Sequence, residues 1–200
     1  MAIIIGDIHG DLEMAAAFLA YYLEEKHIVL GDLVDSRKGA TSDEELACLD
    51  LLLTSDAVLL WGNHDLDYLP ECPWVLGYNQ RIRGELSARF NSARGRFVAA
   101  YAADAWLCTH AGVSPGVAQV IPAEVLALGS GSIAGWLNEE FTRELKMFAG
   151  PLFQRPIWLL LPIARNCKNQ PMGRSCFSCR CSKTPAHIVF NNVFITYEHG

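Results

Sequence analysis

The sequence predicts an α/β fold in which parallel strands bring polar side chains to one edge of a sheet. Four short apolar runs each lead into a block that contains glycine with Asp, Asn or His, and these runs are residues 2–5, 26–30, 57–61 and 105–108. Apolar residues at helical spacing fill the stretches between the first three runs, which gives the order β-α-β-α-β. That order implies parallel strands and right-handed crossovers. Open sheets of this kind place functional residues at the carboxyl ends of the strands.

The two helices between these strands have start signals of their own. The first is predicted over residues 11–25, and Asp11 is positioned as its N-cap. The second is predicted over residues 42–53, where Ser42 and Glu45 have the spacing of a capping box. Connections this short keep the strand ends close together.

The chain is less regular after the third strand. Residues 66–104 contain prolines, glycines and five arginines, and we interpret the arginines either as a solvated helix face or as a lid for a phosphorylated substrate: Arg81, Arg83, Arg89, Arg94 and Arg96. Residues 121–148 have helical spacing around an interruption at 129–132. Two apolar triplets around Asn191-Asn192 predict a hairpin.

Composition limits the class of protein. The chain has 200 residues, 51% of them hydrophobic, so we expect a single globular domain over residues 1–200. Its formal net charge of -6 argues against a general nucleic-acid binder. No apolar run approaches the roughly 20 residues of a membrane helix, and no signal peptide is visible, so we expect a cytoplasmic protein without membrane association. Cys48, Cys72 and Cys108 are expected to be reduced and packed as small apolar groups.

Five polar residues at the strand ends form a candidate metal site, and they are Asp7, His9, Asp32, Asn63 and His110. Any one of them alone would be interpreted as a helix cap or a hydrogen-bonded side chain. Together they supply oxygen and imidazole ligands without a thiolate, which suits divalent Mn, Fe, Zn or Mg. Asp32 follows a central strand and could bridge two ions.

Two ions about 3.5–4 Å apart would polarise a phosphoryl oxygen and turn a bridging water into a hydroxide that attacks phosphorus. His64, beside Asn63, is placed to protonate the leaving oxygen. Asp35 or Asp65 could hold its imidazole in the correct tautomer.

Four blocks resemble the calcineurin-like metallophosphoesterase superfamily, and they are GDIHG at 6–10, GDLVD at 31–35, GNHD at 62–65 and THAG at 109–112. The first and last are most similar to the branch of phosphoprotein phosphatases and symmetrical diadenosine tetraphosphatases. The resemblance covers residues 1 to about 115 and implies two packed mixed sheets flanked by helices, a four-layer sandwich.

The resemblance also implies site residues. Asp7, His9 and Asp32 would bind the first metal ion, and Asp32, Asn63 and His110 the second, with His64 as the general acid. Manganese is the expected metal, with Fe, Zn, Mg and Ni as alternatives.

The chain departs from the family pattern in two places. The branch has Asp-Arg-Gly after its second block, whereas this chain has Asp35-Ser36-Arg37, so the expected phosphate-binding arginine is displaced by one position. Asn63 is also expected at the substrate. The Gly-His-Thr block that supplies the last metal-binding histidine is missing, which leaves His187 and His199 as candidates.

Near the expected position of that block the chain has a cysteine-rich segment, at about 166–182, that contains Cys167, Cys176, Cys179 and Cys181. The four thiols could bind zinc, although their spacing is irregular. The segment could also be a loop with incidental thiols, or the product of an altered reading frame.

The sequence thus predicts a metal-dependent phosphoesterase acting on a phosphorylated protein, a nucleotide or another small phosphoester. The alternative is a non-catalytic binding module that retains the fold with an incomplete second metal site. A nuclease is chemically open to such a site, but the acidic balance counts against it.

Overall fold

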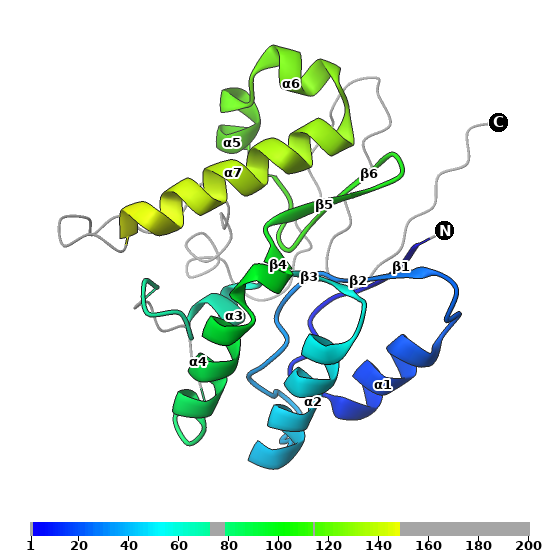
Figure 1. Cartoon of the computed structure of the whole chain (residues 1–200), viewed down its shortest axis with the longest axis vertical. Coiled ribbons are helices and arrows are strands. Elements are labelled where there is room, and N and C mark those ends of the chain that lie inside the picture. The colour runs from blue at the N-terminus through cyan, green and yellow to red at the C-terminus, as the bar shows by residue number, and fades with distance from the viewer. Residues whose placement is uncertain (1, 73–78, 114, 149–200) are drawn as a thin grey trace, which may run out of the picture.

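The computed structural model of this chain describes residues 2–72, 79–113 and 115–148. Its larger sheet has four parallel strands in the order β1-β2-β3-β4, and their bounds are Ala2–Ile5, Lys26–Val29, Val58–Leu60 and Phe97–Val98. The α/β fold and the parallel order of the first three predicted strands are therefore confirmed (Figure 1).

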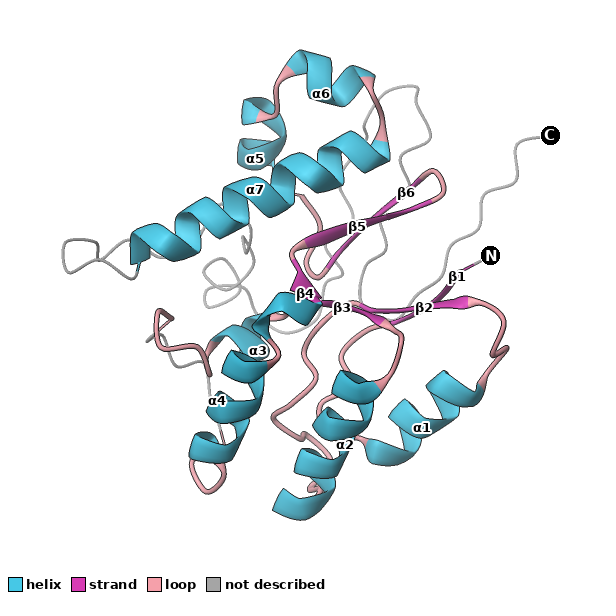
Figure 2. Cartoon of the chain, viewed as in Figure 1, coloured by secondary structure: helices cyan, strands magenta, loops and turns pink. Residues whose placement is uncertain are grey.

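A second, antiparallel sheet contains β5 (Ala100–Ala103) and β6 (Trp106–Thr109), shown in magenta in Figure 2. The strand predicted at 105–108 is β6, so it belongs to this sheet rather than to the parallel one. Strands β4 and β5 were not predicted, because β4 has only two residues and β5 consists of three alanines and one tyrosine, a composition with little strand propensity.

Helix α1 (Leu12–Ala20) begins as predicted, since the Asp11 side chain accepts a hydrogen bond from the Met14 amide at 2.9 Å. It ends five residues before the predicted limit, and Tyr22 has a left-handed φ of 46° that turns the chain toward β2. Helix α2 (Ser42–Thr54) is capped by Thr41 and Glu44. The predicted pair Ser42 and Glu45 was wrong by one residue, and the side chain of Glu45 is buried instead.

The remaining described helices are α3 (Asn63–Leu66), α4 (Arg83–Ser92), the 3-10 turn η1 (Arg94–Arg96), α5 (Pro115–Val120), α6 (Ala123–Ala127) and α7 (Ser130–Phe148). The predicted interruption at 129–132 is confirmed in part: Gly129, with a φ of 88°, separates α6 from α7, whereas residues 130–132 already belong to α7. On α7, the Asn138 side chain accepts hydrogen bonds from the Ala99 and Ala100 amides and donates one to the Ala100 carbonyl.

Both faces of the parallel sheet are covered. Val29 and Leu59 pack with α1, α2 and α4 on one face, whereas Ile28 and Leu60 pack with Cys108 against the second sheet on the other. The outer face of the second sheet packs on Leu137 of α7. Figure 1 shows the resulting layers of helices, sheet, sheet and helices, which is the sandwich that the resemblance implied.

Cys48, Cys72 and Cys108 are buried free thiols, as predicted, and burial raises the pKa of the first two to about 12. Within the described ranges, no helix has the length and hydropathy to cross a membrane. The predicted hairpin, the cysteine-rich segment, His187 and His199 lie outside the described residues.

Candidate metal centre

The centre depends on a close approach of the chain after β2 to the chain after β3. A Cβ atom on Gly31 would lie 2.5 Å from the Gly62 nitrogen, and one on Gly62 would lie 2.1 Å from the Asp32 nitrogen. No other residue type fits at either position. The approach lets the His64 amide donate a hydrogen bond to Asp32 Oδ1 at 3.0 Å.

Backbone strain is concentrated at the same edge. Six described residues other than glycine have a positive φ, and four of them are site candidates: Asp7, His9, Asp32 and Asp35, at 51°, 47°, 54° and 65°. Each such conformation costs on the order of 1–3 kcal/mol and persists only where the surroundings enforce it. Here the His9 amide donates to the Asp32 carbonyl and the Gly10 amide to the Leu33 carbonyl, both at 2.8 Å.

Asp32 stands at the centre of the polar cluster. Its carboxylate belongs to two groups of potential ligand atoms. One group is Asp7, Asp32 and His110, and the other is His9, Asp32 and His64. Within each group, the ligand atoms lie within 4.8 Å of one another. Asp32 Oδ2 lies 3.7 Å from His9 Nε2, and Asp32 Oδ1 lies 3.5 Å from His110 Nε2. The structure thus gathers the predicted ligands around Asp32, with Asp7 grouped with His110 rather than with His9.

The two flanking imidazoles are oriented alike. His9 Nδ1 lies 2.9 Å from the Val34 carbonyl oxygen, and His110 Nδ1 lies 2.8 Å from that of Leu30. Because a carbonyl only accepts, each Nδ1 donates a hydrogen bond to it, and Nε2 is the ring nitrogen left to face the cluster, where a metal ion would be bound. His110 Nε2 lies 3.0 Å from Asn63 Oδ1, which brings the predicted amide ligand into the cluster.

A buried atom without a partner tests whether this cluster suits a metal ion. His9 Nε2 is buried and makes no hydrogen bond, an arrangement that costs roughly 1–3 kcal/mol in a folded protein. Its lone pair faces a carboxylate shared by two ligand groups. Unprotonated imidazole nitrogens beside carboxylate oxygens are the donors that borderline divalent cations select, so the residues fit the implied metals.

His64 is paired with Asp35. Its Nδ1 lies 2.7 Å from Asp35 Oδ2, and both side chains are largely buried. The hydrogen bond to Asp35 raises the pKa of His64, and the charges of Asp32, Asp35 and Asp65 act in the same direction, whereas burial opposes them. Of the two carboxylates predicted to orient this imidazole, Asp35 makes the contact.

Asp65 has a different position. It is fully buried and accepts hydrogen bonds from the amides of Asp32, Leu33 and Gly62 at 2.8–3.0 Å. Burial and the nearby charge of Asp32 raise the pKa of Asp65 above its usual value, although the three amide hydrogen bonds act in the opposite direction. Its side chain therefore fastens the turn that carries Asp32 to the turn that carries Asn63.

Sequence reasoning missed three residues behind Asp35. The Asp35 amide donates to Glu45 Oε1 at 2.6 Å, and the hydroxyl of Tyr68 and the amide of Asn79 both donate to Asp35 Oδ1. In the sequence, Glu45 is recognisable only as a carboxylate in the first turn of a helix, and it was therefore assigned to a capping box. Tyr68 and Asn79 lie in the irregular stretch and have no recognisable motif.

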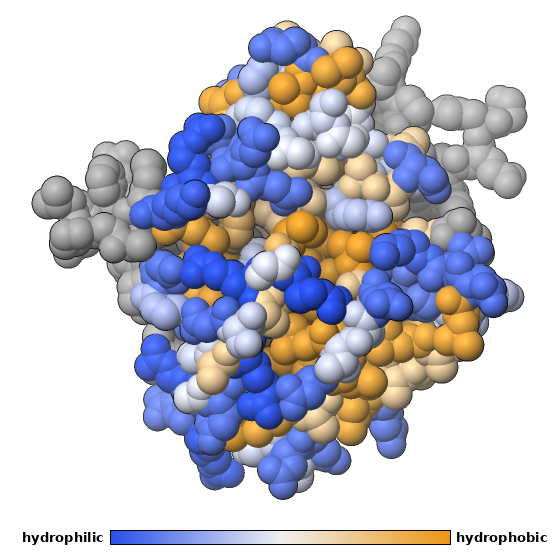
Figure 3. Space-filling view, viewed as in Figure 1, coloured by the Kyte–Doolittle hydropathy of each residue, from blue (hydrophilic) through white to orange (hydrophobic). Residues whose placement is uncertain are grey.

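Most of the predicted arginine cluster serves the fold. Arg89 pairs with Asp50 at 2.7 Å, Arg94 pairs with Glu71 at 2.6 Å, and Arg96 donates to three carbonyls at the end of α2 and beyond it. Figure 3 shows hydrophilic side chains over the region of α4. Of these three, Arg89 lies on the face of α4, as the solvated-face interpretation expects, whereas Arg94 and Arg96 lie in η1 and hold neighbouring segments together. Arg37 and Arg81 are exposed.

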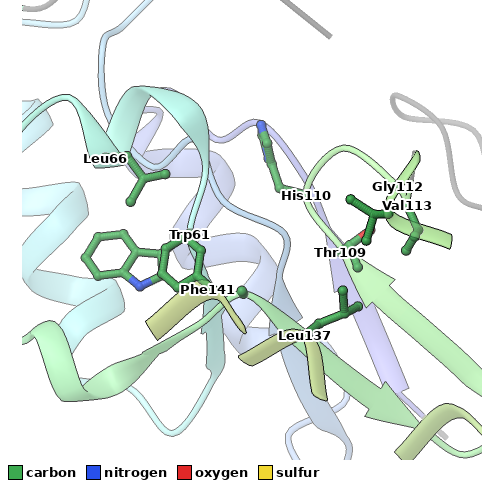
Figure 4. A pocket seen from close by; sticks show the side chains of 10 residues that line it. Trp61, Leu66, Thr109, His110, Gly112, Val113, Leu137 and Phe141 are labelled. Carbon is green, nitrogen blue, oxygen red and sulfur yellow. The ribbon is translucent and has the colours of Figure 1, made fainter. Parts of the chain in front are cut away.

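Apolar packing supports the centre from behind. A cavity of about 20 Å³, room for about one water molecule, lies between the two sheets and α7. Trp61, Leu137 and Phe141 line it, and His110 stands at its edge (Figure 4). The cavity is too small for a substrate. The candidate reacting groups lie on the other, polar side of His110, around Asp32.

Fold and cluster together define an α/β sandwich with a candidate carboxylate–imidazole metal site at the carboxyl edge of its parallel sheet. The sequence model of the calcineurin-like phosphoesterase family matches residues 2–158, and the chain therefore belongs to this family. No curated protein and no solved structure gave a match to the chain. The resemblance read from the four sequence blocks is confirmed at the level of the superfamily.

Proposed function

We propose that this protein hydrolyses phosphate esters with the help of two divalent metal ions held by Asp7, His9, Asp32, Asn63 and His110. The observation that carries the proposal is that Asp32 belongs to two clusters of possible ligand atoms. One contains Asp7 and His110, and the other contains His9, whose Nε2 makes no hydrogen bond, and the proposed acid His64. When bound, two divalent ions would polarise the phosphoryl oxygens and lower the pKa of a water molecule toward neutrality.

His64 donates a proton to the leaving oxygen in this proposal. Its Nδ1 proton is held by Asp35, which leaves Nε2 to face the cluster. The raised pKa of His64 keeps the imidazole protonated nearer to neutral pH, as a general acid requires. Asp35 fixes the ring orientation, and Asp65 holds the two metal-binding turns together.

For the substrate we propose a phosphorylated protein, a nucleotide polyphosphate or another small phosphoester, with manganese as the preferred metal. Arg37, exposed two residues after Asp35, and Asn63 are the proposed phosphate contacts. A screen of phosphopeptides, dinucleotide polyphosphates and phosphodiesters, each with Mn²⁺, Fe²⁺, Zn²⁺, Mg²⁺ and Ni²⁺, would assign both substrate and metal.

The function is tested by hydrolysis of p-nitrophenyl phosphate by the full chain with Mn²⁺ and with a chelator. The wild type is expected to be active only with metal, and Asp32→Asn is expected to lose most of its activity. With phenyl phosphate, whose leaving oxygen needs a proton, His64→Ala is expected to lose about 10²-fold or more, and with p-nitrophenyl phosphate less. Asp56→Asn, a change at an exposed carboxylate, should match the wild type. Equal rates in all four proteins would instead favour a binding module that retains the fold.

A further inference from the structure

The carboxylate of Asp35 is held from both sides. One oxygen, Oδ2, lies 2.7 Å from His64 Nδ1. The other, Oδ1, accepts hydrogen bonds from the Tyr68 hydroxyl at 2.5 Å and from the Asn79 amide at 3.1 Å. A carboxylate bonded only to an imidazole can rotate, because this terminal torsion has broad wells. The bonds to Oδ1 remove that freedom.

The direction of the Tyr68 hydrogen bond is fixed by its neighbour. The hydroxyl oxygen accepts from the Asn79 amide at 2.9 Å, so the hydroxyl proton is directed to Asp35. Burial and the contact with Asp35 raise the pKa of Tyr68 well above its usual range, which keeps this proton in place. The ring is 2% exposed and stacks on Phe90 with centroids 5.8 Å apart.

A second buried carboxylate holds the backbone of the same assembly. Glu45 is 1% exposed, its Oε1 accepts from the Asp35 amide, and its Oε2 accepts from the Asn79 side chain at 3.2 Å. Asp35 needs this support because its φ is 65°. Glu45, Tyr68 and Asn79 thus join α2, the turn after α3 and the segment before α4 at one point behind His64.

We propose that Tyr68 is a positioning residue for proton donation by His64, acting through Asp35, with Glu45 and Asn79 fixing the geometry. This inference rests on the proposed function. It predicts that removing the Tyr68 hydroxyl impairs departure of the leaving group while substrate binding is unaffected.

Tyr68→Phe keeps the ring on Phe90 and removes only the hydroxyl. With phenyl phosphate, whose leaving group is about as basic as a tyrosine side chain, we expect kcat to fall about tenfold, the effect of one hydrogen bond to a charged group, with KM unchanged. With p-nitrophenyl phosphate, whose leaving group needs little protonation, the loss should be much smaller. Glu45→Gln should give the same substrate-dependent loss by weakening the support of Asp35.

Tyr101→Phe, which removes a hydroxyl from β5, is the matched control and should leave both substrates unaffected. In the His64→Ala background, Tyr68→Phe should cause no further loss of kcat, because the group through which it acts is gone. The melting temperature of each variant should be measured as well, so that rates are compared only between folded proteins.

Two results would overturn the positioning role alone: equal losses on both substrates in an active, metal-dependent enzyme, or a full additional loss in the His64→Ala background. A wild-type chain without metal-dependent hydrolysis would overturn the proposed function and this inference with it.

Discussion

Two regions of the molecule are stabilised in different ways: the carboxyl edge of the parallel sheet, and the contact between α7 and the second sheet. At the edge, four residues other than glycine have left-handed backbones, two glycines touch, and the carboxylates of Asp32, Glu45 and Asp65 are buried. In the α7 region, Leu137, Phe141 and Leu145 make ordinary apolar contacts, and Asn138 is satisfied by β5 and the residue before it.

This difference shows where stability comes from and where it is lost. Left-handed backbones and unpartnered buried atoms cost free energy, so the edge keeps its shape only because the surrounding core enforces it. The α7 region stabilises the fold and carries no predicted reacting group. Substitutions in the two regions should therefore affect stability and activity separately.

The largest effect is expected for Gly62→Ala. The new methyl group would overlap the Asp32 nitrogen and Oδ1, at 2.1 and 2.3 Å, so the two turns would have to separate. We expect activity to be lost and the free energy of unfolding in urea to fall by about 3 kcal/mol or more.

Gly135→Ala on α7 is the matched control. A Cβ atom there meets nothing within 4 Å, and alanine favours a helix by up to about 1 kcal/mol. Its stability should be equal or higher and its activity unchanged. Similar losses in both variants would contradict the assignment of the close approach to the site.

A double comparison separates stability from activity. Leu145→Ala should lower the free energy of unfolding by about 2–5 kcal/mol, because it leaves a cavity where a side chain only 6% exposed was packed, while kcat of the folded protein stays the same. Asp32→Asn should abolish activity and, without metal, leave stability unchanged or higher, because it removes a charge beside Asp65. Both quantities are measured on the same samples, by urea unfolding and by rate assays. A loss of kcat in the α7 variant, or a loss of stability in Asp32→Asn, would contradict the comparison.

A smaller effect is expected from Glu144 on α7. Burial, and then the charge of Glu140, raise the pKa of this carboxyl above its usual 4.5. The folded state therefore holds the proton more tightly than the unfolded state, and stability falls as pH rises from about 4 through the folded pKa. Glu144→Gln should flatten this slope in urea unfolding at several pH values, and Glu139→Gln, at an exposed neighbour, should not.

The smallest effect is expected for Arg89→Ala. Its ion pair with Asp50 is exposed, and such pairs contribute about 0–1 kcal/mol. We expect a slightly lower melting temperature and an unchanged KM for p-nitrophenyl phosphate. A clear rise in KM would revive the lid interpretation of the arginines.

The sequence predicted the parts of the fold that repeat a simple pattern. The runs at 2–5, 26–30 and 57–61 end in glycine-flanked polar blocks, so their parallel pairing and the cluster around Asp32 could be expected. Asp11 as a cap and the break at Gly129 follow from local chemistry in the same way.

The parts that could not be predicted depend on contacts between distant segments. The sheet that contains β6 is determined by pairing with β5, whose alanine-rich sequence gives little strand signal. Glu45 has the same sequence signature as a capping residue, and only the position of α2 against Asp35 reveals its burial. Tyr68 and Asn79 meet Asp35 across 33 and 44 residues, a relation that no local pattern records.

Binding of Mn²⁺ to the chelator-treated full chain, followed by titration calorimetry, tests the central claim most directly. The account predicts two ions per wild-type chain, unchanged binding to Asp56→Asn, and loss of binding at both positions in Asp32→Asn, because Asp32 belongs to both ligand groups. Binding by Asp32→Asn with wild-type affinity and stoichiometry, or no binding by the wild type, would contradict it.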